Sequence, residues 1–180
     1  MEKIKVVIIG VGIRGRYTYG NYFEKNKNLY EVVAVVENKI GRRNKFQEIF
    51  NLPQNRVFEN LDDFFKVEKI ANAVIISSID NTHYDAAVKS LKKGYNVLVE
   101  GPDANSLDKL VNLENICEEN KDKIFMAAMP YRYSSFFKKL KNIIESKELG
   151  QLININYNSY IGYDKFAHKY VRGNWRLDSD

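Results

Sequence analysis

Three glycines near the start of the chain have the spacing of a phosphate-binding turn. Residues 10–15 read Gly-Val-Gly-Ile-Arg-Gly, the pattern G-x-G-x-x-G, directly after the apolar run at positions 4–9. In such a turn Gly10 permits the tight bend and Gly12 lets a pyrophosphate approach the backbone. Gly15 brings the following helix close to the strand. This spacing predicts a turn that binds the phosphates of a nucleotide.

A helix predicted over residues 14–25 begins inside this turn. The first amide groups of a helix have no carbonyl partner within it, and together with the helix dipole they attract phosphate groups. Ile13 and Arg14 therefore join the glycines as candidate cofactor-binding residues. The motif alone leaves an ordinary glycine turn as the alternative.

An acidic residue stands where a dinucleotide site needs one. Glu37 closes a second apolar run, EVVAVVE, about 20 residues beyond the glycines. A carboxylate at this place accepts hydrogen bonds from the adenosine ribose and repels a 2′-phosphate, so it favours NAD over NADP. Arg42 and Arg43 follow, and they leave NADP open as the alternative cofactor; otherwise they are surface charges.

Strand and helix patterns alternate along the first 150 residues. The predicted strands are rich in apolar residues and lie at 4–9, 31–37, 56–58, 72–79, 95–100 and 124–128. The amphipathic segments between them predict helices. Alternation with short links predicts an α/β fold, a Rossmann-type doubly wound parallel sheet with helices on both faces. Ligands of such sheets bind at the carboxyl ends of the strands.

The residues from Gln151 onward have a different pattern. Leu152, Ile153 and Ile155 alternate with asparagines, which predicts a strand with one polar side. A single strand leaves its backbone edges unpaired, so it needs partners. We expect an NAD(P)-binding domain at 1–130 and an incomplete α+β substrate or oligomerisation domain at 131–180. The second domain would form a homo-oligomer, or pair with another chain through the strand after Gln151.

Composition limits the class of protein. The chain has 180 residues, of which 44% are hydrophobic and 28% charged, and its net charge is +5. Its basic residues are scattered among acidic ones, which disfavours a nucleic-acid interface. No segment approaches the roughly 20 apolar residues of a membrane helix. One cysteine and two histidines exclude a disulfide scaffold and a Cys/His zinc site. We expect a cytoplasmic protein with no metal, nucleic-acid or membrane partner.

One long segment is similar to a known family. The run from Ile75 to Pro102, IISSIDNTHYDAAVKSLKKGYNVLVEGP, resembles the characteristic segment of the glucose–fructose oxidoreductase, inositol dehydrogenase and MocA (Gfo/Idh/MocA) family. There, an apolar strand leads to a Thr-His helix start and then to a strand ending in Glu-Lys-Pro. VVIIGVGIRGR, VENKIGRR and MPYRYSSFFKKLKNIIESKELGQLININY are also similar. The resemblance implies a nicotinamide-dependent oxidoreductase that transfers hydride between NAD and a sugar or polyol.

The resemblance also implies where cofactor and substrate bind. Its candidate cofactor-binding residues, at the carboxyl ends of the central strands, are Ser77, Ser78, Asn81, His83, Glu100 and Pro102. Its substrate-side candidates, in an interdomain loop and a tail segment, are Tyr131, Arg132, His168, Arg172, Trp175 and Arg176. The alternatives are capping or packing for His83, an aromatic-packed hinge for the interdomain loop, and an exposed loop for His168.

Two features depart from the family pattern. Gly101 stands where the family has a lysine that contacts the nicotinamide ribose and aids proton relay. The chain also ends before the His-x-x-Asp-type pair of the family's substrate domain, so it looks truncated and we assign no catalytic residue. We therefore expect NAD binding with little or no dehydrogenase activity. The alternative is a non-catalytic dinucleotide-binding or interaction module.

Overall fold

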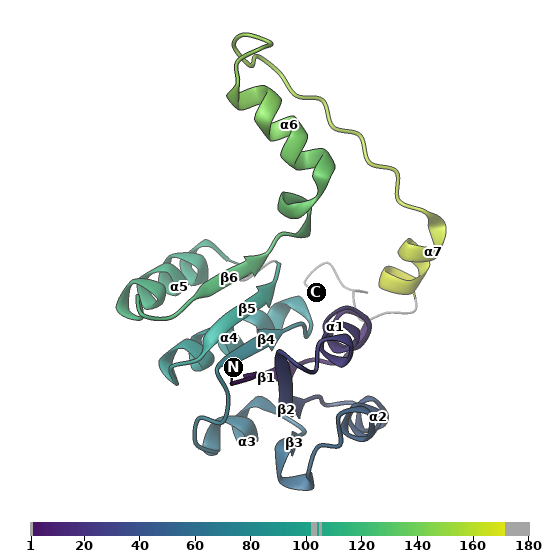
Figure 1. Cartoon of the computed structure of the whole chain (residues 1–180), viewed down its shortest axis with the longest axis vertical. Helices are drawn as coiled ribbons and strands as arrows, with labels where there is room; N and C mark the ends of the chain where they lie inside the picture. The colour runs from purple at the N-terminus through teal and green to yellow at the C-terminus, as the bar shows by residue number, and fades with distance from the viewer. Residues whose placement is uncertain (1, 102–103, 105, 172–180) are drawn as a thin grey trace. The chain divides into compact units, whose positions relative to one another are not determined.

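The computed structural model describes residues 2–101, 104 and 106–171. The chain divides into two compact units, Met1–Ala128 and Met129–Asp180. The first unit is built on a six-stranded sheet in the order β3-β2-β1-β4-β5-β6, and every neighbouring pair of strands runs parallel (Figure 1). This sheet confirms the Rossmann-type α/β fold predicted from the sequence.

The bounds of the elements follow the predicted alternation. The strands are β1 (Ile4–Ile9), β2 (Tyr30–Val36), β3 (Val57–Phe58), β4 (Ala73–Ile76), β5 (Asn96–Glu100) and β6 (Phe125–Ala128). The α-helices of the first unit are α1 (Asn21–Lys25), α2 (Ile40–Phe50), α3 (Leu61–Lys66), α4 (His83–Lys92) and α5 (Leu107–Glu119). A π-helical segment, Arg14–Gly20, leads into α1, and short 3₁₀ turns lie at Gln54–Arg56 and Asp80–Thr82.

The central strand β1 sends alternate side chains into two apolar cores. Val6 and Ile8 lie in the core that holds residues of α1 and α2. Val7 and Ile9 lie in the core that holds residues of α3, α4 and α5. Because both faces are covered there, the buried part of the strand, Val6–Ile9, is apolar at every position instead of alternating with polar residues. Each side chain buried in this way stabilises the fold by about 1.5–3 kcal/mol.

The order of the strands places a crevice at one edge of the sheet. From β1 the chain builds outward through β2 and β3, and it then returns to β4, on the other side of β1, before continuing to β5 and β6. The loops after β1 and β4 therefore leave the sheet in opposite directions. The carboxyl ends of these two strands form the switch point at which open α/β sheets bind ligands.

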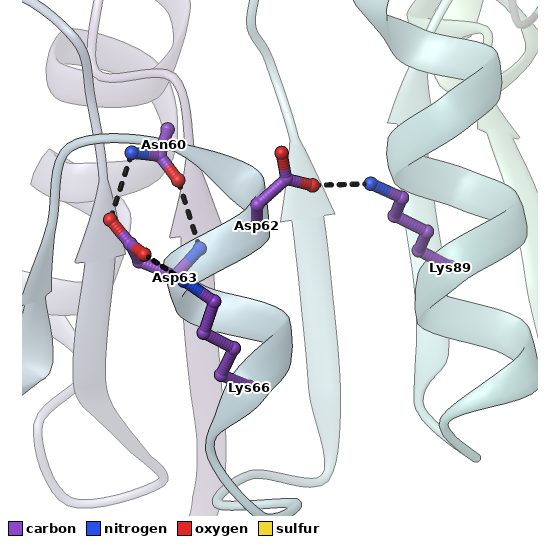
Figure 2. Close-up of polar contacts among 5 residues, drawn as sticks. All are labelled: Asn60, Asp62, Asp63, Lys66 and Lys89. Carbon is purple, nitrogen blue, oxygen red and sulfur yellow. Dashed lines mark hydrogen bonds and ion pairs between the residues drawn. The ribbon is translucent and has the colours of Figure 1, made fainter.

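Polar contacts at the start of α3 fix this helix and join it to α4 (Figure 2). Asn60 caps α3, because its Oδ1 accepts a 2.8 Å hydrogen bond from the backbone N–H of Asp63. Lys66 forms an ion pair of 2.8 Å with Asp63, and Lys89 of α4 forms one of 2.7 Å with Asp62. These exposed contacts hold the start of α3 and link it to α4, and both helices contribute residues to the same apolar core.

The second unit contains α6 (Ser135–Glu145), α7 (Tyr163–Phe166), a 3₁₀ turn at Pro130–Tyr133 and a π-helical segment at Ala167–Val171. Helix α6 ends at Glu145, and Lys147 beyond it takes a left-handed conformation (φ +59°). One detail of the prediction was wrong. The strand predicted from Leu152 is not formed, since residues 152–162 have no regular secondary structure. A strand needs a neighbouring backbone, and the described residues supply none there.

Within the described ranges, no helix combines the length and the hydropathy needed to cross a bilayer.

Candidate functional site

Two of the three motif glycines are required by packing. Gly10 has a φ of +83°, and a Cβ on it would lie 2.5 Å from the Cα of Ser78. A Cβ on Gly15 would lie 2.0 Å from the carbonyl oxygen of Gly10. Both distances are shorter than any tolerable contact, so only glycine fits. The turn after β1 therefore packs tightly on the loop after β4 and on its own helix.

Gly12 is different, because the protein itself leaves room beside it. The nearest heavy atom to a Cβ on Gly12 would be Nη1 of Arg42, at 3.6 Å, which is an ordinary contact with a flexible side chain. The absence of a side chain at Gly12 is thus not explained by packing within the protein. Open room beside the backbone is what the motif predicts at its second glycine, where a ligand would approach.

The carboxylate of Glu37 lies against this turn. Its Oε2 accepts a 2.9 Å hydrogen bond from the backbone N–H of Val11, and its Oε1 accepts one of 2.9 Å from that of Lys39. The residue is only 7% exposed. An ionised carboxylate has about four acceptor positions, so two remain for hydroxyl donors. The structure therefore brings the predicted acidic residue to the glycine turn.

A pocket of about 260 Å³ opens between the glycine turn and α2. Its lining residues come from the turn, the first helical segment and α2, and they are Val11, Gly12, Ile13, Arg16, Tyr17, Arg42, Lys45 and Phe46. Three of these carry a positive charge and none is acidic, so the pocket suits an anionic group.

The cations of this pocket differ in how they are held. Arg16 is paired with Glu24 at 2.9 Å, and its buried Nε has no hydrogen-bond partner among the described residues. The exposed Arg42 and Lys45 form no ion pair within the same ranges. Arg43 instead donates to the carbonyl oxygen of Glu37. Arg42 and Lys45 are thus the charges available to an anion.

The residues after β4 pack against the glycine turn. Ser77 is buried, and its hydroxyl donates a 2.8 Å hydrogen bond to the carbonyl oxygen of Gly10. The Ser78 hydroxyl lies 2.6 Å from that of Thr82. The ring of His83 is 1% exposed, and its Nε2 lies 3.2 Å from the carbonyl oxygen of Ser78. Ser77 and His83 therefore hold the loop after β4 in place through these hydrogen bonds. Their direct contact with a cofactor stays a prediction.

Glu100, the last residue of β5, is held by two side chains from the segment after β1. The hydroxyl of Tyr19 donates a 2.6 Å hydrogen bond to Oε1 of Glu100, and Nε of Arg14 lies 3.4 Å from the same oxygen. Burial raises the pKa of Tyr19, and the hydrogen bond to Glu100 raises it further. Tyr19 was not among the residues predicted from the sequence. Its position one helical turn after Gly15, on the same side of the segment, was the available signal.

The remaining candidates are not brought to this crevice by the described contacts. Asn81 is exposed in the 3₁₀ turn before α4, and Gly101 is exposed in the bend that ends β5. In the second unit, Tyr131 and Arg132 are exposed in the turn before α6, where the ring of Tyr131 packs on Phe137.

Five of the predicted site residues lie wholly or partly outside the described part of the chain. The backbone of His168 lies in the π-helical segment Ala167–Val171, but its side chain is outside the described part. Pro102, Arg172, Trp175 and Arg176 also lie outside the described residues.

Comparison with known proteins places this geometry in context. The model of an oxidoreductase family with an NAD-binding Rossmann fold matches residues 4–128. Glucose-6-phosphate 3-dehydrogenase of Bacillus subtilis is 28% identical over 180 residues, which cover 98% of this chain and 47% of that protein. Inositol 2-dehydrogenase of Salmonella typhimurium is 23% identical over 192 residues, covering 98% and 55%. The chain spans about half the length of these relatives.

Solved structures show the same fold. Scyllo-inositol dehydrogenase from Lactobacillus casei, with bound NAD(H) and scyllo-inositol, has a TM-score of 0.75 and 17% identity over 83% of this chain and 43% of its own. The 3-ketoreductase KijD10 from Actinomadura kijaniata, in complex with NADP, has a TM-score of 0.68 and 18% identity over 83% and 46%.

Proposed function

Because the chain belongs to the Gfo/Idh/MocA oxidoreductase family, whose model has an NAD-binding Rossmann fold, we propose that its first unit binds NAD(H) across the carboxyl edge of the sheet. One observation carries this proposal. Packing requires glycine at Gly10 and Gly15, whereas at Gly12 the protein leaves open room. A turn built in this way offers its backbone to a phosphate group.

The described residues suit the parts of a dinucleotide. The pyrophosphate lies over Gly12 and Ile13, and Arg14 begins the helical segment whose free amides face it. The adenosine ribose lies beside Glu37, which has acceptor positions left for its hydroxyls. Arg42 lines the adjoining pocket. The other cofactor-binding candidates are Ser77, Ser78, Asn81, His83 and Glu100, together with Pro102, which lies outside the described residues.

NAD would supply a hydride acceptor, and the chain's own residues would orient it. We propose that the complete activity is a sugar or polyol dehydrogenation, since relatives include glucose-6-phosphate and inositol dehydrogenases. The substrate-side candidates are Tyr131, Arg132, His168, Arg172, Trp175 and Arg176. With Gly101 at the lysine position, the first unit offers no proton donor there. Loss of a positioned general acid–base lowers rates by about 10²–10⁴-fold, so we expect weak or no turnover from this chain.

A second function is an interaction module, in which the second unit pairs with another chain. Helix α6 has no buried residue, and Ile153 in the segment after Gln151 is 94% exposed. Such apolar surface is costly in water and marks interaction sites. A homo-oligomer, or pairing through the segment after Gln151, would cover it. Light scattering tests the homo-oligomer: a strictly monomeric, well-ordered chain would count against the second function. We also propose the cytoplasm as the compartment, where NAD(H) is present.

Calorimetric titration with NADH tests the proposed function. The unmodified chain should give saturable heat, whereas Gly12→Val should fold normally and give none, because its side chain occupies the space of the pyrophosphate. Gly41→Val is the matched control, since Gly41 also has open space beside it but lies outside the turn. Absence of heat from the unmodified chain at millimolar NADH would refute dinucleotide binding. Assays of NADH formation over a panel of sugars and polyols would then test turnover, and robust rates would refute the expected inactivity.

A further inference from the structure

The two adjacent arginines at the start of α2 lie in different surroundings. Arg42 is exposed and lines the pocket beside the glycine turn. The side chain of Arg43 is only 11% exposed, and both of its terminal nitrogens are engaged by the protein. Its Nη1 donates a hydrogen bond to the backbone carbonyl oxygen of Glu37, and its Nη2 lies 3.2 Å from Oε2 of Glu59. The two arginines are therefore not equally available to a ligand.

Arg43 connects three segments at the carboxyl edge of the sheet. It belongs to the first turn of α2, whereas Glu37 follows β2 and Glu59 follows β3. Its backbone N–H also donates a 2.9 Å hydrogen bond to the carbonyl oxygen of Lys39, at the start of the helix. A planar guanidinium holds two acceptors in a fixed geometry, which the single ammonium of a lysine does not. Arg43 thus fastens the loop between β2 and α2 to the end of β3.

This loop carries the carboxylate of Glu37 and one of its two donors. The backbone N–H of Glu37 donates a 3.0 Å hydrogen bond to the carbonyl oxygen of Phe58, and its carbonyl oxygen accepts from Arg43. The peptide group after Glu37 is therefore fixed, and the backbone N–H of Lys39, which holds Oε1, follows directly. If that peptide turned, the N–H of Lys39 would leave the carboxylate. Arg43 therefore controls the direction of the carboxylate through the backbone.

We propose that Arg43 is a positioning residue that strengthens the preference for NAD(H) by holding the loop that orients Glu37. This inference rests on the proposed NAD(H) binding. A carboxylate held in one direction accepts the ribose hydroxyls with little loss of conformational freedom, and its negative charge stays where it repels a 2′-phosphate. The charge of Arg43 is mostly buried and paired with Glu59, so it is not offered to a phosphate.

The two cofactors distinguish positioning from phosphate binding. Arg43→Met removes both side-chain contacts and keeps an unbranched side chain. The affinity for NADH should fall by about threefold to fivefold, because Glu37 is less well oriented. The affinity for NADPH should change by less than about twofold, because the repulsion weakens together with the hydrogen bonding. An arginine that bound the 2′-phosphate would show the opposite order, with the larger loss for NADPH. Fluorescence titration measures both affinities.

A second measurement tests whether Arg43 acts through Glu37. ADP and 2′-deoxy-ADP differ only in a ribose hydroxyl that Glu37 would accept, so the ratio of their dissociation constants reports this hydrogen bond. Arg43→Met should lower the ratio by about threefold, whereas a general loosening of the fold would weaken both ligands equally. In a chain that already carries Glu37→Gln, the same substitution should change the ratio by less than about twofold, because residues that act together are not additive.

Two further variants complete the test. Arg43→Lys keeps the charge but cannot hold Glu37 and Glu59 together, so it should lower the ratio for ADP and 2′-deoxy-ADP in the same direction as Arg43→Met. It decides the question if circular dichroism shows that Arg43→Met does not fold. Arg56→Met, in the 3₁₀ turn before β3, is the matched control and should change neither the ADP ratio nor the preference between cofactors.

Failure of this proposal differs from failure of the proposed function. If the unmodified chain binds NADH and ADP, but the Arg43 variants leave both ratios unchanged or weaken NADPH more than NADH, the role of Arg43 is refuted while dinucleotide binding stands. If the unmodified chain binds neither NADH nor ADP, the proposed function itself is refuted, and the role of Arg43 with it.

Discussion

The backbone N–H of Val11 donates a 2.9 Å hydrogen bond to Oε2 of Glu37, and this bond joins the glycine turn to the end of β2. The other oxygen accepts from the backbone N–H of Lys39. The carboxylate is therefore held at the turn before any ligand binds. A group fixed in advance loses little conformational freedom on binding, so its acceptor positions favour affinity.

Glu37 should set the preference between the two nicotinamide cofactors. Its carboxylate accepts ribose hydroxyls and repels a 2′-phosphate, so the unmodified chain should bind NADH more tightly than NADPH. Glu37→Gln removes the repulsion and should narrow the ratio by about tenfold, a value typical of one unfavourable charge contact. Fluorescence titration with both cofactors measures it. Tighter binding of NADPH by the unmodified chain would contradict the preference for NAD.

Arg42 should act in the opposite sense. It lines the pocket beside the glycine turn and forms no ion pair among the described residues, so its charge is available to a 2′-phosphate. Arg42→Ala should weaken NADPH by about fivefold and NADH by less than about twofold. Arg56→Ala, before β3 and outside the pocket, is the control. The same loss for both cofactors would mean that Arg42 contacts the pyrophosphate instead.

Substitution of Gly15 should lower the stability of the fold, whereas substitution of Gly12 should weaken the binding of NADH. A Cβ on Gly15 would collide with the carbonyl oxygen of Gly10, so Gly15→Ala should lower the free energy of unfolding by about 3 kcal/mol or more. Gly12→Ala meets only Arg42 at 3.6 Å and should change it by no more than about 0.5 kcal/mol, yet weaken NADH strongly. Urea denaturation and NADH titration measure the two effects. Unchanged NADH affinity in Gly12→Ala would show that no phosphate lies there.

Local sequence patterns were sufficient for the sheet. The run Val6–Ile9 is apolar at every position because both faces of β1 are covered there, and this pattern depends on few other residues. The strand predicted from Leu152 was wrong because its formation depends on another segment of the chain, which the local pattern does not show. Alternation describes which side of a strand is buried, but the strand forms only beside a second backbone.

The sequence predicted the parts of the site whose residues lie within one short segment of the chain. The spacing of the glycines and Glu37 is a property of one strand–turn–helix–strand unit, so the sequence showed it. The contact of Tyr19 with Glu100 joins residues 81 positions apart and depends on β4 lying beside β1 and β5 beside β4. The sequence did not show whether Ser77 and His83 contact a ligand or only hold the loop after β4 in place. Their burial distinguishes the two roles, and burial depends on the packing of the whole fold.

The cap of α3 should contribute measurably to stability. Asn60→Ala removes the acceptor for the backbone N–H of Asp63 and should lower the free energy of unfolding by about 1 kcal/mol. The exposed ion pair between Asp62 and Lys89 should contribute less, about 0.2–1 kcal/mol in a double-mutant cycle. Urea denaturation at low and high salt measures both, and only the ion pair should weaken with salt. A larger coupling for the ion pair than for the cap would contradict this ranking.

Tyr19 should make stability depend on pH in the alkaline range. Its pKa in the folded chain is raised above the ordinary value of about 10, mainly by burial and then by Glu100. Above that pH the unfolded chain releases a proton that the folded chain retains, so the stability from Tyr19 is complete below pH 10 and is lost as the pH rises toward its folded pKa. Tyr19→Phe should therefore be less stable than the unmodified chain near pH 8, because it lacks the hydrogen bond to Glu100, and the difference should shrink near pH 11.

Other tyrosines with raised pKa values, including Tyr95, contribute equally to both proteins and cancel in the comparison. Urea midpoints at the two pH values measure the difference, with Tyr84→Phe as the control. A difference that is constant or grows with pH would show that the Tyr19 hydroxyl is not held as a donor to Glu100.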